Sequence, residues 1–242
     1  MKKKLYILLI FIFCNIFQLN AEEIPYLLTA SAKGDLDTVK AIIQSGGNPN
    51  TEDKDNINAL MYAARKNQVA IIEYLISQGA EVNKVEKDGW TALMFASKKN
   101  HNETVKVLLN NNADPKITDP DGWSAYGLAA TSGHHETIDL LLKGGIDPNS
   151  RNNSGLTVLM LACKSGNLKT IEILIDNGSK VELKDRYGKT ALIHATTHGN
   201  ENAINLLLYK GAKVNVTDDS KWSALMWAIK NKKYKAAKVL IL

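Results

Sequence analysis

Residues 88–96 read Asp-Gly-Trp-Thr-Ala-Leu-Met-Phe-Ala, and this order of residue types returns along the chain at a fixed interval. The threonine of this stretch has a Ser, Thr or Asn counterpart in each repeat: Asn58, Thr91, Ser124, Thr157, Thr190 and Ser223. Alanine recurs five positions further on each time: Ala63, Ala96, Ala129, Ala162, Ala195 and Ala228. One period before Asn58, Pro25, Leu27 and Ala30 keep the register. A period of about 33 residues, held through seven units without an insertion, indicates a repeat protein.

Each unit predicts two helices. The Ser, Thr or Asn precedes an apolar stretch, where its side-chain oxygen can accept from the first free helical N–H groups. The second half of a unit carries apolar residues at helical spacing, as in Val105, Leu108 and Leu109. A Gly or Asn after each stretch tolerates the left-handed backbone that ends a helix. Asp88-Gly89 and Asp121-Gly122 predict tight reversals between units.

The pattern therefore predicts an all-α solenoid of about seven helix-turn-helix units with hairpin-like finger loops. A single helix pair carries too little apolar area to fold alone, so each unit must stack on the next. The recurring alanine fits this arrangement, because a larger side chain at the stacking contact would separate neighbouring units. The expected unit bounds after residue 21 are 22–50, 51–83, 84–116, 117–149, 150–182, 183–215 and 216–242.

The unit that begins at Asp88 and continues through Asn100-His101 and Val105-Lys-Val-Leu-Leu109 resembles the ankyrin repeat. This resemblance covers nearly all of residues 22–242, and it implies a non-catalytic module that binds other proteins. Two departures stand out. Methionine replaces the histidine of the family's Thr-Pro-Leu-His start at Met61, Met94, Met160 and Met226, which predicts apolar packing there. The fourth unit has Tyr126-Gly127 in place of Leu-Met.

Residues 1–21 have the layout of a secretory signal peptide. Three lysines at positions 2–4 precede an apolar run at 5–17, and the small residue Ala21 is the expected cleavage point. An uncleaved membrane anchor is the alternative, although the run is short of the roughly 20 residues that span a bilayer. We therefore expect a periplasmic or secreted protein, from a bacterium given the composition rich in Lys, Asn and Ile.

Charge and cysteine content narrow the function classes. The formal charge is +5, and removal of three lysines with the signal leaves +2, which gives no general argument for binding nucleic acid or anionic membrane. An apolar share of 45% excludes disorder over the whole length. Two cysteines exclude a disulfide framework, and cleavage would leave only Cys163.

No sequence motif for catalysis, phosphate binding or zinc binding is present. His101 and His134 occupy one repeat position, where the resemblance implies a structural role. His194 and His198 are one helical turn apart and could share a metal, but no Cys, Asp or Glu completes the site at a suitable spacing. Cys163 takes the place of small core residues in other units. We predict no catalytic site, no cofactor and no metal.

Stacked units create an extended concave surface of finger loops and first helices, on which we expect a protein partner to bind. Tryptophan and arginine dominate binding hot spots, and basic residues favour an acidic partner surface. A tryptophan at this position could instead pack against the adjacent finger. The candidate contact residues are Arg65, Lys66, Trp90, Lys98, Lys99, Trp123, Leu156, Lys164, Tyr187 and Trp222.

The sequence leaves the role of such binding open. A partner-binding monomer is the leading hypothesis. An envelope scaffold or protective factor for a resident enzyme, or a secreted effector directed at host proteins, are the alternatives. The identity of the partner is not encoded in the repeat pattern, because arrays of one fold bind unrelated targets.

Overall fold

The computed structural model describes residues 25–241, so the expected signal segment lies outside the described residues. Within that range fourteen helices form seven successive pairs, in agreement with the predicted solenoid. The pairs are α2 (Tyr26–Lys33) with α3 (Leu36–Gln44), α4 (Ala59–Arg65) with α5 (Val69–Ser77), α6 (Ala92–Lys98) with α7 (Asn102–Asn110), α8 (Ala125–Ser132) with α9 (His135–Lys143), α10 (Val158–Ser165) with α11 (Leu168–Asp176), α12 (Ala191–His198) with α13 (Glu201–Tyr209), and α14 (Ala224–Lys230) with α15 (Tyr234–Ile241).

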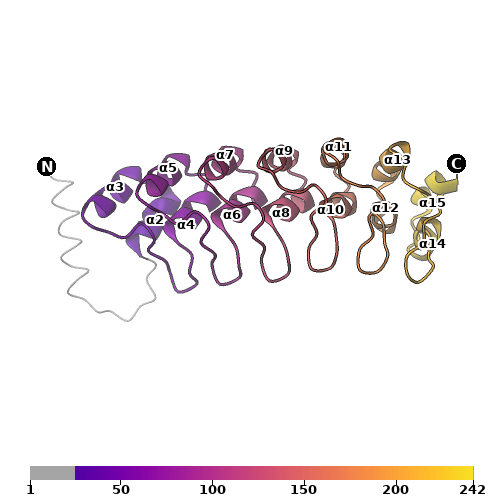
Figure 1. Cartoon of the computed structure of the whole chain (residues 1–242), viewed down its shortest axis with the longest axis horizontal. Coiled ribbons are helices and arrows are strands. Elements are labelled where there is room, and N and C mark those ends of the chain that lie inside the picture. The colour runs from indigo at the N-terminus through magenta and orange to yellow at the C-terminus, as the bar shows by residue number, and fades with distance from the viewer. Residues whose placement is uncertain (1–24, 242) are drawn as a thin grey trace.

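The pairs stand in a single row from one end of the molecule to the other (Figure 1). The first helices of the pairs form one layer and the second helices form another, and the main contacts join helices of the same or adjacent units. The connections at 45–58, 78–91, 111–124, 144–157, 177–190 and 210–223 are the finger loops, which project to one side of the row. Isolated β-bridges such as Thr118–Ser124 close several of these loops.

The repeated Ser, Thr or Asn caps the first helix of its unit, as the sequence predicts. The side chain of Asn58 accepts a hydrogen bond from the backbone N–H of Met61 at 2.9 Å, and Thr91 accepts from Met94 at 3.2 Å. These bonds satisfy N–H groups that no helical carbonyl can reach. The same contact is present in the remaining units at Ser124, Thr157, Thr190 and Ser223.

The first helices end in left-handed backbone. Gly133 follows α8 with φ of +75°, and a Cβ there would lie 2.5 Å from Nδ2 of Asn167 in the next unit. Glycine is favoured at this position by its left-handed backbone, and a larger residue would also have to displace the Asn167 side chain. Asparagine adopts the same conformation at Asn67 and Asn100, with φ of +58° and +59°.

The core runs unbroken along the row between the two helix layers. The recurring alanines are buried in every unit, as stacking requires. Met61, Met94 and Met160 are also buried, which confirms that apolar packing replaces the histidine position of the resemblance. Met226 differs, since its side chain is 51% exposed. The last unit has no following unit in the described chain to cover that side chain.

Side chains also link each unit to its neighbour by hydrogen bonds. His101 Nε2 lies 3.3 Å from the carbonyl oxygen of Arg65, and His134 Nε2 lies 3.2 Å from that of Lys98. Each histidine thus contacts the end of the first helix one unit earlier, where carbonyls lack helical partners. This geometry supports a structural role for both histidines. Burial lowers the pKa of His134, which favours its neutral form.

A second inter-unit contact comes from asparagine. The side chain of Asn83 donates to the carbonyl of Asn112 at 2.9 Å and accepts from the N–H of Asp114 at 2.8 Å. Asn50 and Asn149 make the same two bonds one unit ahead of themselves. Lys116 holds this position between Asn83 and Asn149, and it cannot reproduce the pattern because a lysine side chain has no acceptor. Glu182, one unit after Asn149, makes only the accepted bond, from the N–H of Lys213 at 2.9 Å.

Candidate binding surface

Five basic residues lie at the ends of the first helices. Arg65 and Lys66 end α4, Lys98 and Lys99 end α6, and Lys164 lies in the last turn of α10. All five are exposed, and none makes an ion pair with another described residue. Among the described residues, Lys98 Nζ donates to the Ser132 hydroxyl alone, at 3.1 Å. These residues, which we call the basic row, carry uncompensated positive charge.

Aromatic rings surround the first member of the basic row. Arg65 Cζ lies 5.2 Å from the ring centre of Phe95 and 5.9 Å from that of Tyr62. Phe95 in turn contacts Trp90, with ring centres 5.1 Å apart and planes tilted by 49°. A guanidinium beside aromatic faces gains cation–π attraction, which holds it in one orientation. Tyr62 and Phe95 were not among the residues predicted from sequence.

Each finger tryptophan contacts a residue of its own unit. Trp222 lies 5.4 Å from Trp227 between ring centres, and Lys230 Nζ is 4.7 Å from each ring. Trp123 lies against Gly127, since a Cβ on that glycine would be 3.3 Å from Trp123 Cε3. Trp90, Trp123 and Trp222 are all half-buried, so each both packs and presents part of its ring.

The other two finger candidates lie apart from the basic row. Tyr187 is 68% exposed on the tip of its loop, and Leu156 is half-buried beside a pocket between two finger loops. Lys189, in the same finger as Tyr187, places Nζ 3.8 Å from the ring centre of Trp227 in the next unit. The structure thus brings the predicted candidates into several groups along the row of units.

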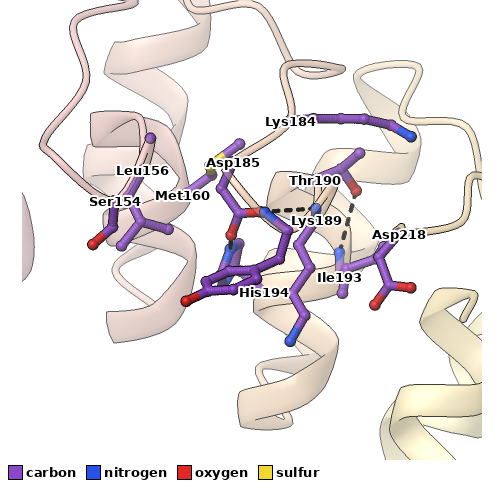
Figure 2. Close-up of polar contacts among 12 residues, drawn as sticks. Ser154, Leu156, Met160, Lys184, Asp185, Lys189, Thr190, Ile193, His194 and Asp218 are labelled. Carbon is purple, nitrogen blue, oxygen red and sulfur yellow. Dashed lines mark hydrogen bonds and ion pairs between the residues drawn. The ribbon is translucent and has the colours of Figure 1, made fainter. Parts of the chain in front are cut away.

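A carboxylate at the base of each of several finger loops attaches the loop to the following helix. Asp185 Oδ1 accepts from the backbone N–H groups of Tyr187 and Lys189, both at 2.9 Å. Its second oxygen lies 2.8 Å from His194 Nε2 (Figure 2). We call this arrangement the finger–helix contact, and sequence reasoning missed it.

The finger–helix contact recurs with different donors. Asp53 Oδ2 accepts from the Tyr62 hydroxyl at 2.8 Å, and Asp218 Oδ2 accepts from the indole N–H of Trp227 at 2.8 Å. In each case the donor stands nine positions after the carboxylate. Burial alone would raise the pKa of Asp218, but hydrogen bonds from Trp222 and Trp227 reverse that effect and lower it.

His194 is therefore part of a structural contact. Burial lowers its pKa, and the hydrogen bond to Asp185 only partly opposes this shift, so the neutral ring donates Nε2–H. His198 Nδ1 instead lies 2.9 Å from the backbone oxygen of His194. The two histidines direct their nitrogens to different partners, and the described residues contain no cluster of three or more metal-ligating side chains.

Cys163 lies fully buried in α10 and is a free thiol. Burial raises its pKa, so the thiol stays protonated and is a poor nucleophile. It occupies the position of the buried Ala64, Ala130 and Thr196 in other units, which fits a small core residue.

Comparison with known proteins identifies this arrangement. The family model for ankyrin repeats (three copies) matches residues 27–119, 126–218 and 182–242. The chain belongs to the ankyrin-repeat family. Domains of this family are generally protein-interaction modules and typically lack catalytic activity. No curated protein sequence matches the chain.

Two solved ankyrin-repeat structures show the similarity in three dimensions. The ankyrin-repeat domain of human ASB11 superposes with a TM-score of 0.81 at 27% identity, covering 90% of this chain and 97% of that one. The ankyrin-repeat domain of Bcl-3, described as a unique member of the IkappaB family, gives a TM-score of 0.79 at 22% identity. That match covers 92% of this chain and all of the Bcl-3 domain.

The alternative that residues 1–21 remain as a membrane anchor concerns a part of the chain outside the described residues. Among residues 25–241, no helix combines the length and apolar character needed to cross a bilayer.

Proposed function

We propose that this ankyrin-repeat chain is an exported, non-catalytic module that binds an acidic surface of a partner protein through its concave face and finger loops. The observation that supports this most directly is the basic row. Its five exposed cations have no acidic partner among the described residues, and the first of them lies beside aromatic rings.

Helix stability alone does not account for the basic row. One cation near a helix C-terminus interacts favourably with the helix dipole, by about 0.3–1 kcal/mol. Arg65–Lys66 and Lys98–Lys99 instead place two cations in succession at one helix end, where like charges repel. An acidic partner surface would remove this repulsion on binding, and the long-range attraction would speed association.

Aromatic groups beside the basic row add a second kind of contact. Trp90 and Phe95 are half-buried, so part of each ring remains available to a partner. Because Arg65 is already oriented by Phe95 and Tyr62, less side-chain entropy is lost when it binds a carboxylate. An acidic surface that also presents an apolar residue would therefore be bound best.

Export is proposed from the pattern of residues 1–21. The intact mass of the protein purified from its native cells tests this step. A chain that begins at Glu22 is the expected result, and a mass that retains residues 1–21 would contradict cleavage. Cell fractionation would then separate an envelope protein from one released to the outside.

Removal of charge from the basic row tests the binding surface. The partner is first captured by crosslinking to the mature chain, and its association is measured over a range of salt concentrations. Alanine at Arg65, Lys66, Lys98 and Lys99 together is expected to slow association by about tenfold or more and to flatten the salt dependence. The matched control removes the same charge elsewhere, with alanine at Lys180, Lys213, Lys235 and Lys238, which are exposed and form no ion pair with a described residue.

Thermal stability should stay nearly constant in both variants, because exposed charges contribute little to folding. If the basic-row variant associates as fast as the control and with the same salt dependence, this surface does not bind the partner.

A further inference from the structure

A pocket of about 260 Å³ lies between finger loops 111–124 and 144–157, at the junction of the fourth and fifth units. Its lining includes apolar Trp123, Leu156 and Leu161 and polar Lys116, Ser150 and Arg151. We call it the interfinger pocket. Lys116 and Arg151 are exposed, so the pocket reaches the surface. Three departures from the repeat pattern meet at this one place.

The first departure is Gly127. The same repeat position holds Met61, Met94 and Met160, all buried, so the fourth unit lacks a side chain that fills this space elsewhere. Trp123 takes up part of the room, and a Cβ on Gly127 would lie 3.3 Å from its Cε3 and 3.7 Å from Leu161 Cδ1. The remaining volume is the apolar part of the pocket.

The second departure is Lys116. At the equivalent position Asn50, Asn83 and Asn149 each bond to a carbonyl and an N–H of the following unit. The corresponding groups ahead of Lys116 are the carbonyl of Gly145 and the N–H of Asp147. Neither has a hydrogen-bond partner among the described residues. The replacement thus leaves a backbone donor free at the pocket and adds a cation.

The third departure is Asn152, which stands where the other full fingers carry an acid: Asp53, Glu86, Asp119, Asp185 and Asp218. Asn152 Oδ1 still accepts from the backbone N–H groups of Ser154 and Leu156, both at 3.0 Å. Its amide nitrogen makes no hydrogen bond to a described residue. The pocket therefore lacks a negative charge that the repeat pattern would place beside it.

The polar lining of the interfinger pocket is rich in donors. Ser150 Oγ is buried without a hydrogen-bond partner among the described residues, and the N–H of Asp147 is free. Arg151 donates to the carbonyls of Gly155 and Lys184, which holds its guanidinium in place without neutralising it. Lys116 forms no ion pair with a described residue. The Asp147 carboxylate is the opposing charge, and one of its oxygens accepts from the N–H of Asn149.

Size decides between classes of occupant. Pockets for drug-sized molecules measure about 300–1,000 Å³, so a space of about 260 Å³ suits a single large side chain better than a cofactor. The apolar wall of Trp123 and Leu161 would contact that side chain, while Lys116 and Arg151 would face a carboxylate next to it.

We propose that the interfinger pocket binds one large apolar side chain of a partner protein, with an adjacent Asp or Glu held by Lys116 and Arg151. The proposal rests on the protein-binding function above, but it uses residues other than the basic row. The junction of the fourth and fifth units would thus be a second contact, separate from the basic row, that recognises particular residues in the partner's sequence.

Selection of random linear peptides on the mature chain tests this proposal, with synthetic copies of the enriched peptides used for affinity measurement. The expected peptides share a large apolar residue next to Asp or Glu. Gly127→Met restores the residue of the other units, fills the pocket and should weaken these peptides by about tenfold or more. Met94→Leu is the control at the same repeat position, and it should change nothing because the swap conserves volume.

Lys116→Asn provides a second variant that does not alter the core. Asparagine restores the inter-unit bonds and removes the cation, so the preference for Asp or Glu should fall by about threefold or more with the fold intact. Circular dichroism checks that both variants fold.

The outcomes separate the two proposals. Peptides that bind Gly127→Met as tightly as the unaltered chain, or that lack the apolar–acidic pattern, overturn the pocket, as does a selection without enrichment. If such peptides lose affinity only when the basic row is replaced, the proposed function stands and the pocket does not. If the peptides lose affinity for Gly127→Met but not for the basic-row variant, the pocket is supported independently of the basic row.

Discussion

Replacement of Asp185 by alanine tests whether the finger–helix contact stabilises the array. The carboxylate accepts three hydrogen bonds, from Tyr187, Lys189 and His194, and its side chain is only 2% exposed. With about 0.5–1.5 kcal/mol for each net bond, Asp185→Ala should cost about 2–4 kcal/mol. At roughly 2–4 °C per kcal/mol for a chain of this size, Tm should fall by about 4–16 °C.

The array supplies its own comparison for this variant. Asn152 already performs the backbone half of the contact without a carboxylate, opposite Leu161. Asp185→Asn should therefore keep both backbone bonds and cost about 1 kcal/mol or less. The pair Asp185→Asn with His194→Leu recreates the Asn152–Leu161 arrangement and should be more stable than Asp185→Ala.

Urea unfolding followed by circular dichroism measures these differences, and hydrogen exchange at the Tyr187 and Lys189 amides reports the finger itself. Exchange should accelerate at both amides in Asp185→Ala and stay slow in Asp185→Asn. Equal losses of stability in the two variants would refute the reasoning, since only the alanine removes the acceptor of the backbone N–H groups.

Burial leads to four further predictions. Ala129→Leu should cost about 1–3 kcal/mol in urea unfolding because the alanine is fully buried between units, whereas Ala70→Leu on the exposed face of α5 should stay within about 0.5 kcal/mol. Tyr126→Phe should raise stability by up to about 1 kcal/mol, since its buried hydroxyl has no partner among the described residues; a loss would reveal a hidden bond. Cys163 should react with a thiol reagent only after unfolding, because burial raises its pKa, and reaction in the native state would contradict that burial. The pKa of His194 in the fold lies below the ordinary 6.5, so its contribution to the free energy of unfolding is present above pH 6.5 and is lost as the pH falls toward the lowered value. His194→Leu should make stability less sensitive to acid. An unchanged dependence of stability on pH would contradict this prediction.

The features that were predicted correctly from sequence are those that depend on a single residue type and not on its neighbours in space. A cap needs a short side chain with an oxygen, so Thr91 and Asn58 were recognisable without their surroundings. A left-handed helix end favours Gly or Asn, which follow every described first helix except α14, where Lys232 takes this conformation, and the stacking contact needs alanine. Because these demands return at the same place in every unit, the fold follows from the pattern.

The finger–helix contact was missed for the opposite reason. Tyr62, His194 and Trp227 are unlike in size, charge and hydropathy, and they share only an N–H or O–H donor at one position. The signal is a carboxylate followed nine positions later by a donor, which a search for similar residues does not detect. The basic row was predictable as a set of exposed cations, but the lack of ion partners depends on how units stack.

The interfinger pocket lies at a junction that is less stable than the others in the array. The junction ahead of Lys116 lacks the two asparagine bonds found at three other junctions, which are together worth about 1–3 kcal/mol. Gly127 lowers stability further, because glycine inside a helix costs about 1 kcal/mol relative to alanine. In a row of units stability is nearly a sum of local terms, so a loss here is not recovered elsewhere. Such losses at one place, with free donors and cations around an apolar space, are expected of a site shaped for binding.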